Sequence, residues 1–319
     1  MASWAPKPPF PGLFFLWAAA VKMAGPYWVS VAVVVLMTVR NGATVIDPNQ
    51  LAPIVQEILN RYTPSYIGAD GNRKFPMFSV AVSVPLNKDK FDMSKVTDDG
   101  EAVRTKILNC DVYIGNRVVA ATVLRWRNVL YQCPNERVQW RDVPKKCNRK
   151  EINTWADIDK FCDVQSIERI LFAQAAHAES RTLDYFKDKD KIRKNSKDDL
   201  MVFYVRASPC GETCTNPNND RNILSKLQAI TNWTNYVVVF SDVFRPDDKN
   251  NNQDRVNELR GSLERLGDAI ADQGPKVKDK RSNGLQHIFR CYRQPEMDEM
   301  KCLICNTNGA VAHKCILGG

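Results

Sequence analysis

One histidine, one glutamate and two cysteines stand in an order that can do chemistry. His177 is followed two residues later by Glu179, and Cys210 and Cys214 come after the apolar run Leu200–Val205. An imidazole and two thiolates leave one corner of a tetrahedral zinc ion open for water, whose pKa zinc lowers towards about 7. The sequence therefore predicts that His177, Cys210 and Cys214 bind a catalytic Zn²⁺.

Glu179 has a different task from these three residues. A carboxylate close to the metal but not bound to it can take a proton from the water and deliver it to the substrate, which is general acid and base catalysis. We assign Glu179 the role of proton shuttle.

The order of these residues resembles a known motif. His177-x-Glu179 lies in an alanine-rich stretch, and a strand-like run ending in Pro209-Cys210 follows it. The zinc-dependent cytidine and nucleic-acid deaminase superfamily carries H-x-E and then P-C-x-x-C. The resemblance covers about residues 45–275 and implies a zinc-dependent hydrolase that removes an exocyclic amine from a nucleobase. It also implies a helix break at 173–176, so that the zinc lies over a helix N-terminus.

The chain departs from the pattern at one point, because three residues separate Cys210 from Cys214 where the motif has two. We expect residues 211–213 to bulge so that both cysteines still bind one zinc, with Gly211 tolerating the backbone angles of the bulge. The alternative is a Cys210–Cys214 disulfide. The chain would then be a catalytically inactive secreted binding or structural protein on a deaminase-like fold.

Apolar periodicity predicts the elements around the motif. Helices are expected over 48–62, 222–230 and 256–271, and strands over 75–84 and 236–240. Residues 111–127 form one strand with a turn at Gly115-Asn116 or the two strands of a hairpin. This alternation predicts a three-layered α/β/α fold with a mixed central sheet, the order that the deaminase superfamily shows.

Two cysteine-bearing segments extend this predicted domain. Residues 128–160 form an insertion longer than an ordinary connection. Trp140 and Trp155 either stack on a base or fill a small core of this insertion, and the core is favoured. Residues 276–319 form a cysteine-rich tail. A second, structural zinc site is an alternative in this tail, with Cys302, Cys305, His313 and Cys315 as ligands, although disulfides are favoured.

The start of the chain predicts secretion. Two apolar runs within residues 1–43 each have the length of a signal-peptide core and are too short to span a bilayer. An uncleaved signal anchor that holds the protein at the membrane is the alternative. Apart from Cys210 and Cys214, eight of the ten cysteines remain, an even number that fits disulfides, and Asn232-Trp233-Thr234 is an N-glycosylation sequon.

Size and charge bound the possible partners. The chain has 319 residues, 44% of them hydrophobic, and a formal net charge of +9. This composition excludes a disordered chain and favours an acidic partner. Together with the motif, this composition indicates a nucleoside or nucleic-acid substrate. It distinguishes neither a nucleoside from a nucleic acid nor cytosine from adenine. The oligomeric state is left open.

Overall fold

A computed structural model describes residues 46–140, 142–147, 152–173, 175–185, 198–244, 252–274, 284–293 and 299–317. The chain divides into two units, Met1–Ala43 and Thr44–Gly319, and all described residues belong to the second. The predicted signal segment therefore lies outside the described residues.

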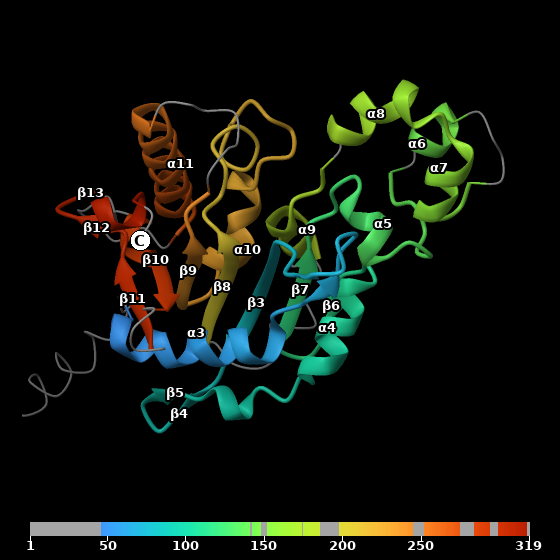
Figure 1. The fold of residues 1–319 in the computed structure, drawn as a ribbon. Helices are drawn as coiled ribbons and strands as arrows, with labels where there is room; N and C mark the ends of the chain where they lie inside the picture. Colours follow the sequence, from blue (N-terminus) through green and yellow to red (C-terminus); the bar gives the residue numbers. More distant parts are fainter. Residues whose placement is uncertain are drawn as a thin grey trace, which may run out of the picture. The chain divides into compact units, whose positions relative to one another are not determined.

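Helices and strands alternate along this unit (Figure 1). The helices are α3 (Pro48–Tyr62), α4 (Gly100–Leu108), α5 (Asn128–Gln132), α6 (Asp142–Lys146), α7 (Trp155–Phe161), α8 (Val164–Ala173), α9 (Ala178–Tyr185), α10 (Gln228–Thr231) and α11 (Asn252–Gln273). The strands of the central sheet are β3 (Phe78–Val84), β6 (Tyr113–Ile114), β7 (Val118–Thr122), β8 (Leu200–Ala207), β9 (Asn235–Asp242), β10 (Ile288–Arg293) and β11 (Met300–Ile304). The pairs β1 (Tyr66–Ile67) with β2 (Arg73–Lys74), β4 (Leu86–Asn87) with β5 (Lys90–Phe91), and β12 (Asn306–Thr307) with β13 (Ala310–Val311) form short hairpins.

The central sheet has the strand order β11-β10-β9-β8-β3-β7-β6. Strands β8, β9 and β10 run parallel, whereas β3 pairs antiparallel with both β8 and β7. The sheet is therefore mixed. Strands β10 and β11, which form one edge of it, come from the segment 276–319 that the sequence analysis assigned to a tail.

Helices cover both faces of this sheet. Successive strand residues alternate between two cores: Val80 and Val82 pack with α3 and α4, whereas Ala81 packs on the side of α9, α10 and α11. Strand β3 is consequently buried at every position, as expected for a strand between two helical layers. The predicted three-layered α/β/α architecture, with its mixed central sheet, is confirmed.

The local signals of the sequence hold for several elements. Asp47 caps α3 by accepting a hydrogen bond from the backbone N–H of Asn49, and Pro48 occupies the first turn, where it costs no hydrogen bond. Residues 111–127 form the β6–β7 hairpin. Helix α4 was not predicted, although Asp99 caps it through the N–H of Ala102; only Val103 and Ile107 of this short helix are buried, too few for a clear periodic pattern.

The predicted insertion has a small core of its own. Trp140 and Trp155 are buried and meet edge to face, with ring centroids 5.0 Å apart. The disulfide Cys147–Cys162 joins the residues after α6 and α7, and Cys110–Cys133 joins the residue after α5 to the chain that follows α4. Both tryptophans therefore fill a core, as expected.

The alternative of a second, structural zinc site in the tail is wrong. Cys302 is bonded to Cys291 across strands β10 and β11, and Cys305 is bonded to Cys315. Three of the four candidate ligands are thus used in disulfides. The antiparallel pairing places Cys291 directly opposite Cys302 and so accounts for the first of these bonds.

Among the helices that the structure describes, none is both long enough and apolar enough to cross a bilayer.

We predict that replacing both Cys110 and Cys133 by alanine lowers the free energy of unfolding by about 3 kcal/mol, because that disulfide closes a loop of 23 residues in the unfolded chain. Urea unfolding of the secreted protein measures the loss. Peptide mapping without reductant verifies that the other three disulfides remain. An unchanged free energy of unfolding would show that this bond does not restrict the unfolded chain.

Candidate metal centre

His177 lies at the start of a helix rather than in the middle of one. Helix α8 ends at Ala173 and α9 begins at Ala178, so the expected break is confirmed. The residue before the histidine, Ala176, exchanges two backbone hydrogen bonds of 2.9 Å with Leu124, just beyond β7. The carbonyl of His177 accepts from the N–H of Arg181 at 3.1 Å. The imidazole is thereby presented at the N-terminal end of α9.

Two buried contacts hold α9 on the sheet. The hydroxyls of Thr182 and Ser79 are 2.6 Å apart, and both residues are fully buried. Arg181 donates to the carbonyls of Thr122 and Cys110. Burial lowers the pKa of this guanidinium to about 10. These contacts fix the position of His177 and Glu179 relative to strands β3 and β7.

Both cysteines belong to a tight loop that follows β8. The N–H of Thr215 donates to the carbonyl of Cys210 at 3.1 Å. This bond spans five residues, one more than in an α-helix. The N–H of Cys214 donates to the sulfur of Cys210 at 3.3 Å. A wide turn of this kind accommodates the extra residue between the cysteines.

The expected role of Gly211 is corrected. Gly211 does not adopt the left-handed backbone region. A Cβ there would instead lie 2.8 Å from the side chain of Glu258 on α11. The glycine therefore provides room for a close approach of helix and loop rather than an unusual backbone angle.

Helix α11 holds this loop through Ser262 and Arg265. The hydroxyl of Ser262 donates to the carbonyl of Pro209 at 2.6 Å and contacts the hydroxyl of Thr215 at 2.9 Å. Arg265 donates through Nε to the carbonyl of Thr215 at 2.7 Å. Because Ser262 and Thr215 are almost completely buried, these bonds satisfy groups that water cannot reach.

Three potential ligand atoms converge between α9 and this loop. Nδ1 of His177 lies 2.9 Å from the sulfur of Cys214 and 3.8 Å from that of Cys210, and the sulfurs are 3.3 Å apart. Zinc bonds of ordinary length in a tetrahedron separate two sulfurs by about 3.8 Å and a nitrogen from a sulfur by about 3.6 Å. The cluster is therefore close to the size that one zinc ion requires. Of the described residues, only these three form a group of this kind.

The sulfurs of Cys210 and Cys214 are not bonded to each other. Both residues are free cysteines, and their separation of 3.3 Å exceeds the roughly 2.05 Å of a disulfide. The structure thus contains two separate thiols at these positions and not a disulfide.

Glu179 lies beside the cluster without joining it. Its side chain is buried, with 7% of the residue exposed, and it lies in the first turn of α9, where a negative charge interacts favourably with the helix dipole. Burial raises its pKa, and the neighbouring His177 partly offsets this effect. The carboxyl therefore holds a proton to a higher pH than a solvated glutamate.

Burial and mutual contacts shift the pKa of each of the three groups in the cluster. Burial lowers the pKa of His177, but the hydrogen bond to Cys210 and the charge of Glu179 raise it further than burial lowers it. The hydrogen bond from Cys214 lowers the pKa of Cys210, while the same contact raises that of Cys214. One thiolate is thus stable and a second is not, unless a cation lies between the sulfurs. An imidazole and two thiols are donors that suit zinc.

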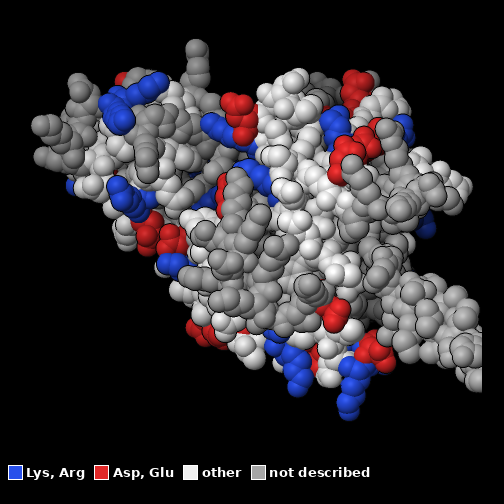
Figure 2. Space-filling view, turned by 180° about the vertical axis from the view of Figure 1, so that it is seen from behind, with Lys and Arg blue, Asp and Glu red and all other residues white. Residues whose placement is uncertain are grey.

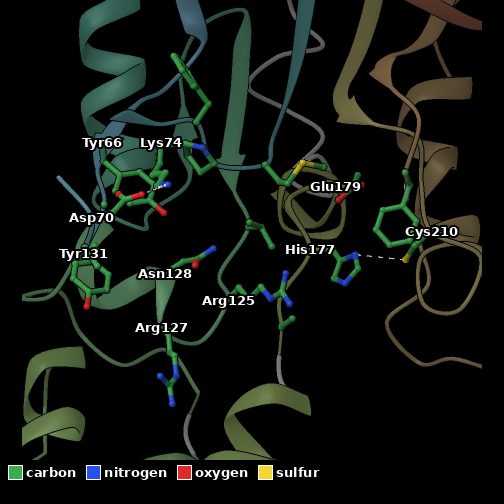
Figure 3. Close-up of a pocket in the computed structure, with 18 of the residues that line it drawn as sticks. Tyr66, Asp70, Lys74, Arg125, Arg127, Asn128, Tyr131, His177, Glu179 and Cys210 are labelled. Atoms are coloured by element: carbon green, nitrogen blue, oxygen red, sulfur yellow. Dashed lines mark hydrogen bonds and ion pairs between the residues drawn. The ribbon is translucent and has the colours of Figure 1, made fainter. Parts of the chain in front are cut away.

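The cluster opens onto a cavity of 820 Å³ at the carboxyl end of β8 (Figure 3). His177, Glu179 and Cys210 form one wall, and Arg125 lies near the histidine. The opposite wall carries aromatic, polar and charged side chains: Tyr66, Asp70, Lys74, Asn128 and Tyr131. A volume of this size fits a small organic molecule.

The sequence indicates the four central residues but not those that position them. Arg181, Ser262 and Arg265 come from two helices, and no local pattern marks them. Arg125 was also missed. The signal that could have indicated a place for Arg125 in the cavity is its position just beyond β7, at the same edge of the sheet as Cys210.

The comparison with protein families gives one match. Residues 139–272, which contain all four central residues, match the family described as Secreted Novel AID/APOBEC-like Deaminase 1. The match fits a divergent member of the cytidine deaminase superfamily and confirms the resemblance derived from the motif. Neither a curated protein nor a solved structure matches the chain. The description of the family indicates secreted proteins, in agreement with the predicted localisation.

We predict that Ser262→Ala destabilises the protein by about 1 to 3 kcal/mol, because the carbonyl of Pro209 and the hydroxyl of Thr215 lose a buried partner. Chemical denaturation measures the change. Ser94→Ala, which removes a hydroxyl from an exposed hydrogen bond, is the matched control and should cost less than about 0.5 kcal/mol. Equal effects of the two substitutions would contradict the positioning role of Ser262.

Proposed function

Because residues 139–272 fit a divergent member of the cytidine deaminase superfamily, we propose that the protein is a secreted zinc-dependent deaminase that hydrolyses the exocyclic amine of a nucleobase. The convergence of His177, Cys210 and Cys214 beside a buried Glu179, on the wall of a cavity, supports this proposal most directly. A fold of this class would not support the proposal by itself, because one fold hosts many functions.

The three converging side chains are the proposed metal ligands. When bound there, zinc makes water a nucleophile at neutral pH. The imidazole contributes Nδ1, the ring nitrogen that faces both sulfurs. The bond from Ser262 to the carbonyl of Pro209 holds the start of the cysteine loop, and the preceding residue, Ser208, lines the cavity.

Glu179 performs the proton transfers in this proposal. Its carboxylate accepts the first proton of the attacking water and delivers it to the ring nitrogen. It then accepts the second proton from the new hydroxyl group and delivers it to the departing amine, as the bond between the ring carbon and that amine breaks. A buried carboxyl with a raised pKa holds each proton between its acceptance and its delivery. Its position in the first turn of α9, and not among the converging donor atoms, leaves it free for this task.

Arg125 points to the class of substrate. Lys74 is paired with Asp70, and Arg127 is paired with Glu168. Among the described residues, the guanidinium of Arg125 has neither an ion pair nor a hydrogen bond to another side chain, although it faces the cavity. A free guanidinium there favours a substrate that carries phosphate, and we therefore place nucleotides or nucleic acid before free nucleosides.

The net charge of the chain does not by itself distinguish a phosphate-bearing substrate from a free nucleoside. On the face shown in Figure 2, lysines and arginines alternate with aspartates and glutamates instead of gathering in one area. The described residues of that face thus form no single basic patch that would indicate a substrate, and the local arrangement at the cavity is the better guide.

We predict that Glu179→Gln lowers the deamination rate by at least about 10² to 10⁴-fold while zinc content stays near one ion per chain, because the carboxyl moves protons but does not bind the metal. Release of ammonia from nucleosides, single-stranded DNA and RNA measures the rate, and elemental analysis measures zinc. Glu101→Gln, an exposed glutamate at the start of α4, is the control. Full activity of Glu179→Gln would refute the assigned role, and a zinc-loaded wild type without turnover on any substrate would favour the inactive alternative.

Cys214→Ser is expected to lose the zinc, because one of two thiolate ligands is removed. Circular dichroism tests whether the fold persists. The Glu179→Gln protein, which should retain metal, serves as the comparison for the elemental analysis. Undiminished zinc in Cys214→Ser would exclude Cys214 as a ligand.

Arg125→Gln should lower kcat/KM by about 10 to 100-fold on a phosphate-bearing substrate and leave a free nucleoside unaffected, since a hydrogen bond to a charged group contributes about 1.5 to 3 kcal/mol. Arg260→Gln, on an exposed position of α11 that does not line the cavity, controls for the loss of one charge. Equal losses on both kinds of substrate would contradict a phosphate contact.

A further inference from the structure

The turn between α10 and β9 carries a sequence that the candidate metal centre does not use. Asn232-Trp233-Thr234 is the only Asn-x-Ser/Thr sequence in the chain. Such a sequence is an acceptor for N-linked glycans where it lies on the surface of a secreted protein.

The three residues of this turn divide into two exposed side chains and one buried side chain. Asn232 and Thr234 are exposed, whereas Trp233 is only 7% exposed and packs into the core beneath α10 and α11. The backbone N–H of Trp233 also donates to the carbonyl of Ile230 at 3.0 Å. The tryptophan therefore anchors the turn and leaves the amide and the hydroxyl in solvent.

The amide of Asn232 is not used to hold the fold together. Its backbone N–H donates to the carbonyl of Gln228 as the last bond of α10. Its side chain makes no hydrogen bond to any described residue. A modification at the side-chain nitrogen consequently breaks no interaction in the described part of the protein.

The turn lies far from the candidate metal centre. Strand β9 begins at Asn235, three residues after Asn232, and the cavity residue Phe244 follows its other end. The eight residues of β9 span about 26 Å at roughly 3.3 Å per residue. A large group on Asn232 thus leaves the cavity open.

We propose that Asn232 carries an N-linked oligosaccharide. The chain follows the secretory route, as the family description and four disulfides indicate. There, the side-chain nitrogen of Asn232 bonds to the anomeric carbon of a lipid-diphosphate-linked oligosaccharide and loses one proton. The bond from that carbon to the diphosphate oxygen breaks, and the lipid diphosphate departs with the electron pair.

This modification has a structural consequence. The glycan covers the end of the sheet at which β9 begins, so that this end faces solvent and does not form a protein interface. The opposite end, with the cavity, is the face available to a substrate.

The experiment uses the full chain secreted from cultured animal cells. Intact mass is measured before and after digestion with a peptide N-glycosidase, which converts a glycosylated asparagine to aspartate. We expect the untreated protein to be heavier by at least one core oligosaccharide and the digested protein to carry aspartate at position 232. An unchanged mass on digestion of the wild type would overturn the proposal without reference to any variant.

Variants then assign the position. Asn232→Gln and Thr234→Ala should both lack the mass of the glycan, whereas Thr234→Ser should retain it, because serine preserves the acceptor sequence. Asn218→Gln, at an exposed asparagine outside any acceptor sequence, is the matched control and should remain glycosylated. A glycan that persists in Thr234→Ala, or one mapped to another residue, would contradict the assignment to Asn232.

Discussion

The antiparallel pairing of β3 with β8 is the constraint on which the rest of the structure depends. Strand β8 ends in the loop that carries Cys210 and Cys214, and β3 holds α9, which presents His177, through the buried contact of Ser79 with Thr182. Residues far apart in the sequence therefore meet because two strands are in register. Burial of both strands between helical layers fixes that register, since a slip of one residue would exchange the side chains of the two cores.

A cluster of two thiols, an imidazole and a carboxyl is costly to bury, and the surrounding bonds offset this cost. Helix α11 holds the cysteine loop through Ser262 and Arg265, and Arg181 holds α9 through two carbonyls. All of these bonds satisfy backbone groups near the cluster. These bonds hold the side chains of the cluster in place, which reduces the conformational entropy that binding of a ligand there would cost.

The disulfides act where the hydrophobic cores are small. The insertion between β7 and α9 buries a limited set of residues around Trp140 and Trp155; one disulfide lies within it, and a second joins it to the chain that follows α4. One of them links Cys110 to the residue directly after α5, the helix that contributes Asn128 and Tyr131 to the cavity wall. The carbonyl of Cys110 also accepts from Arg181. Covalent bonds that stabilise the insertion therefore also position the wall opposite the histidine.

The sequence by itself determined the layered fold, the helix break before α9, the cysteines left for disulfides and the four residues of the candidate site. The layers, the cysteines and the four residues follow from periodicity, capping and the types and spacing of a few side chains, all of which are local, whereas the helix break follows from the resemblance to the deaminase superfamily. Only the tertiary structure decided how the extra residue between Cys210 and Cys214 is accommodated, that Gly211 supplies space for α11, that Cys291 and Cys302 are opposite each other, and that Arg125 shares a cavity with His177. These facts depend on strand register and on contacts between distant segments, and such contacts leave no signature in the neighbouring sequence.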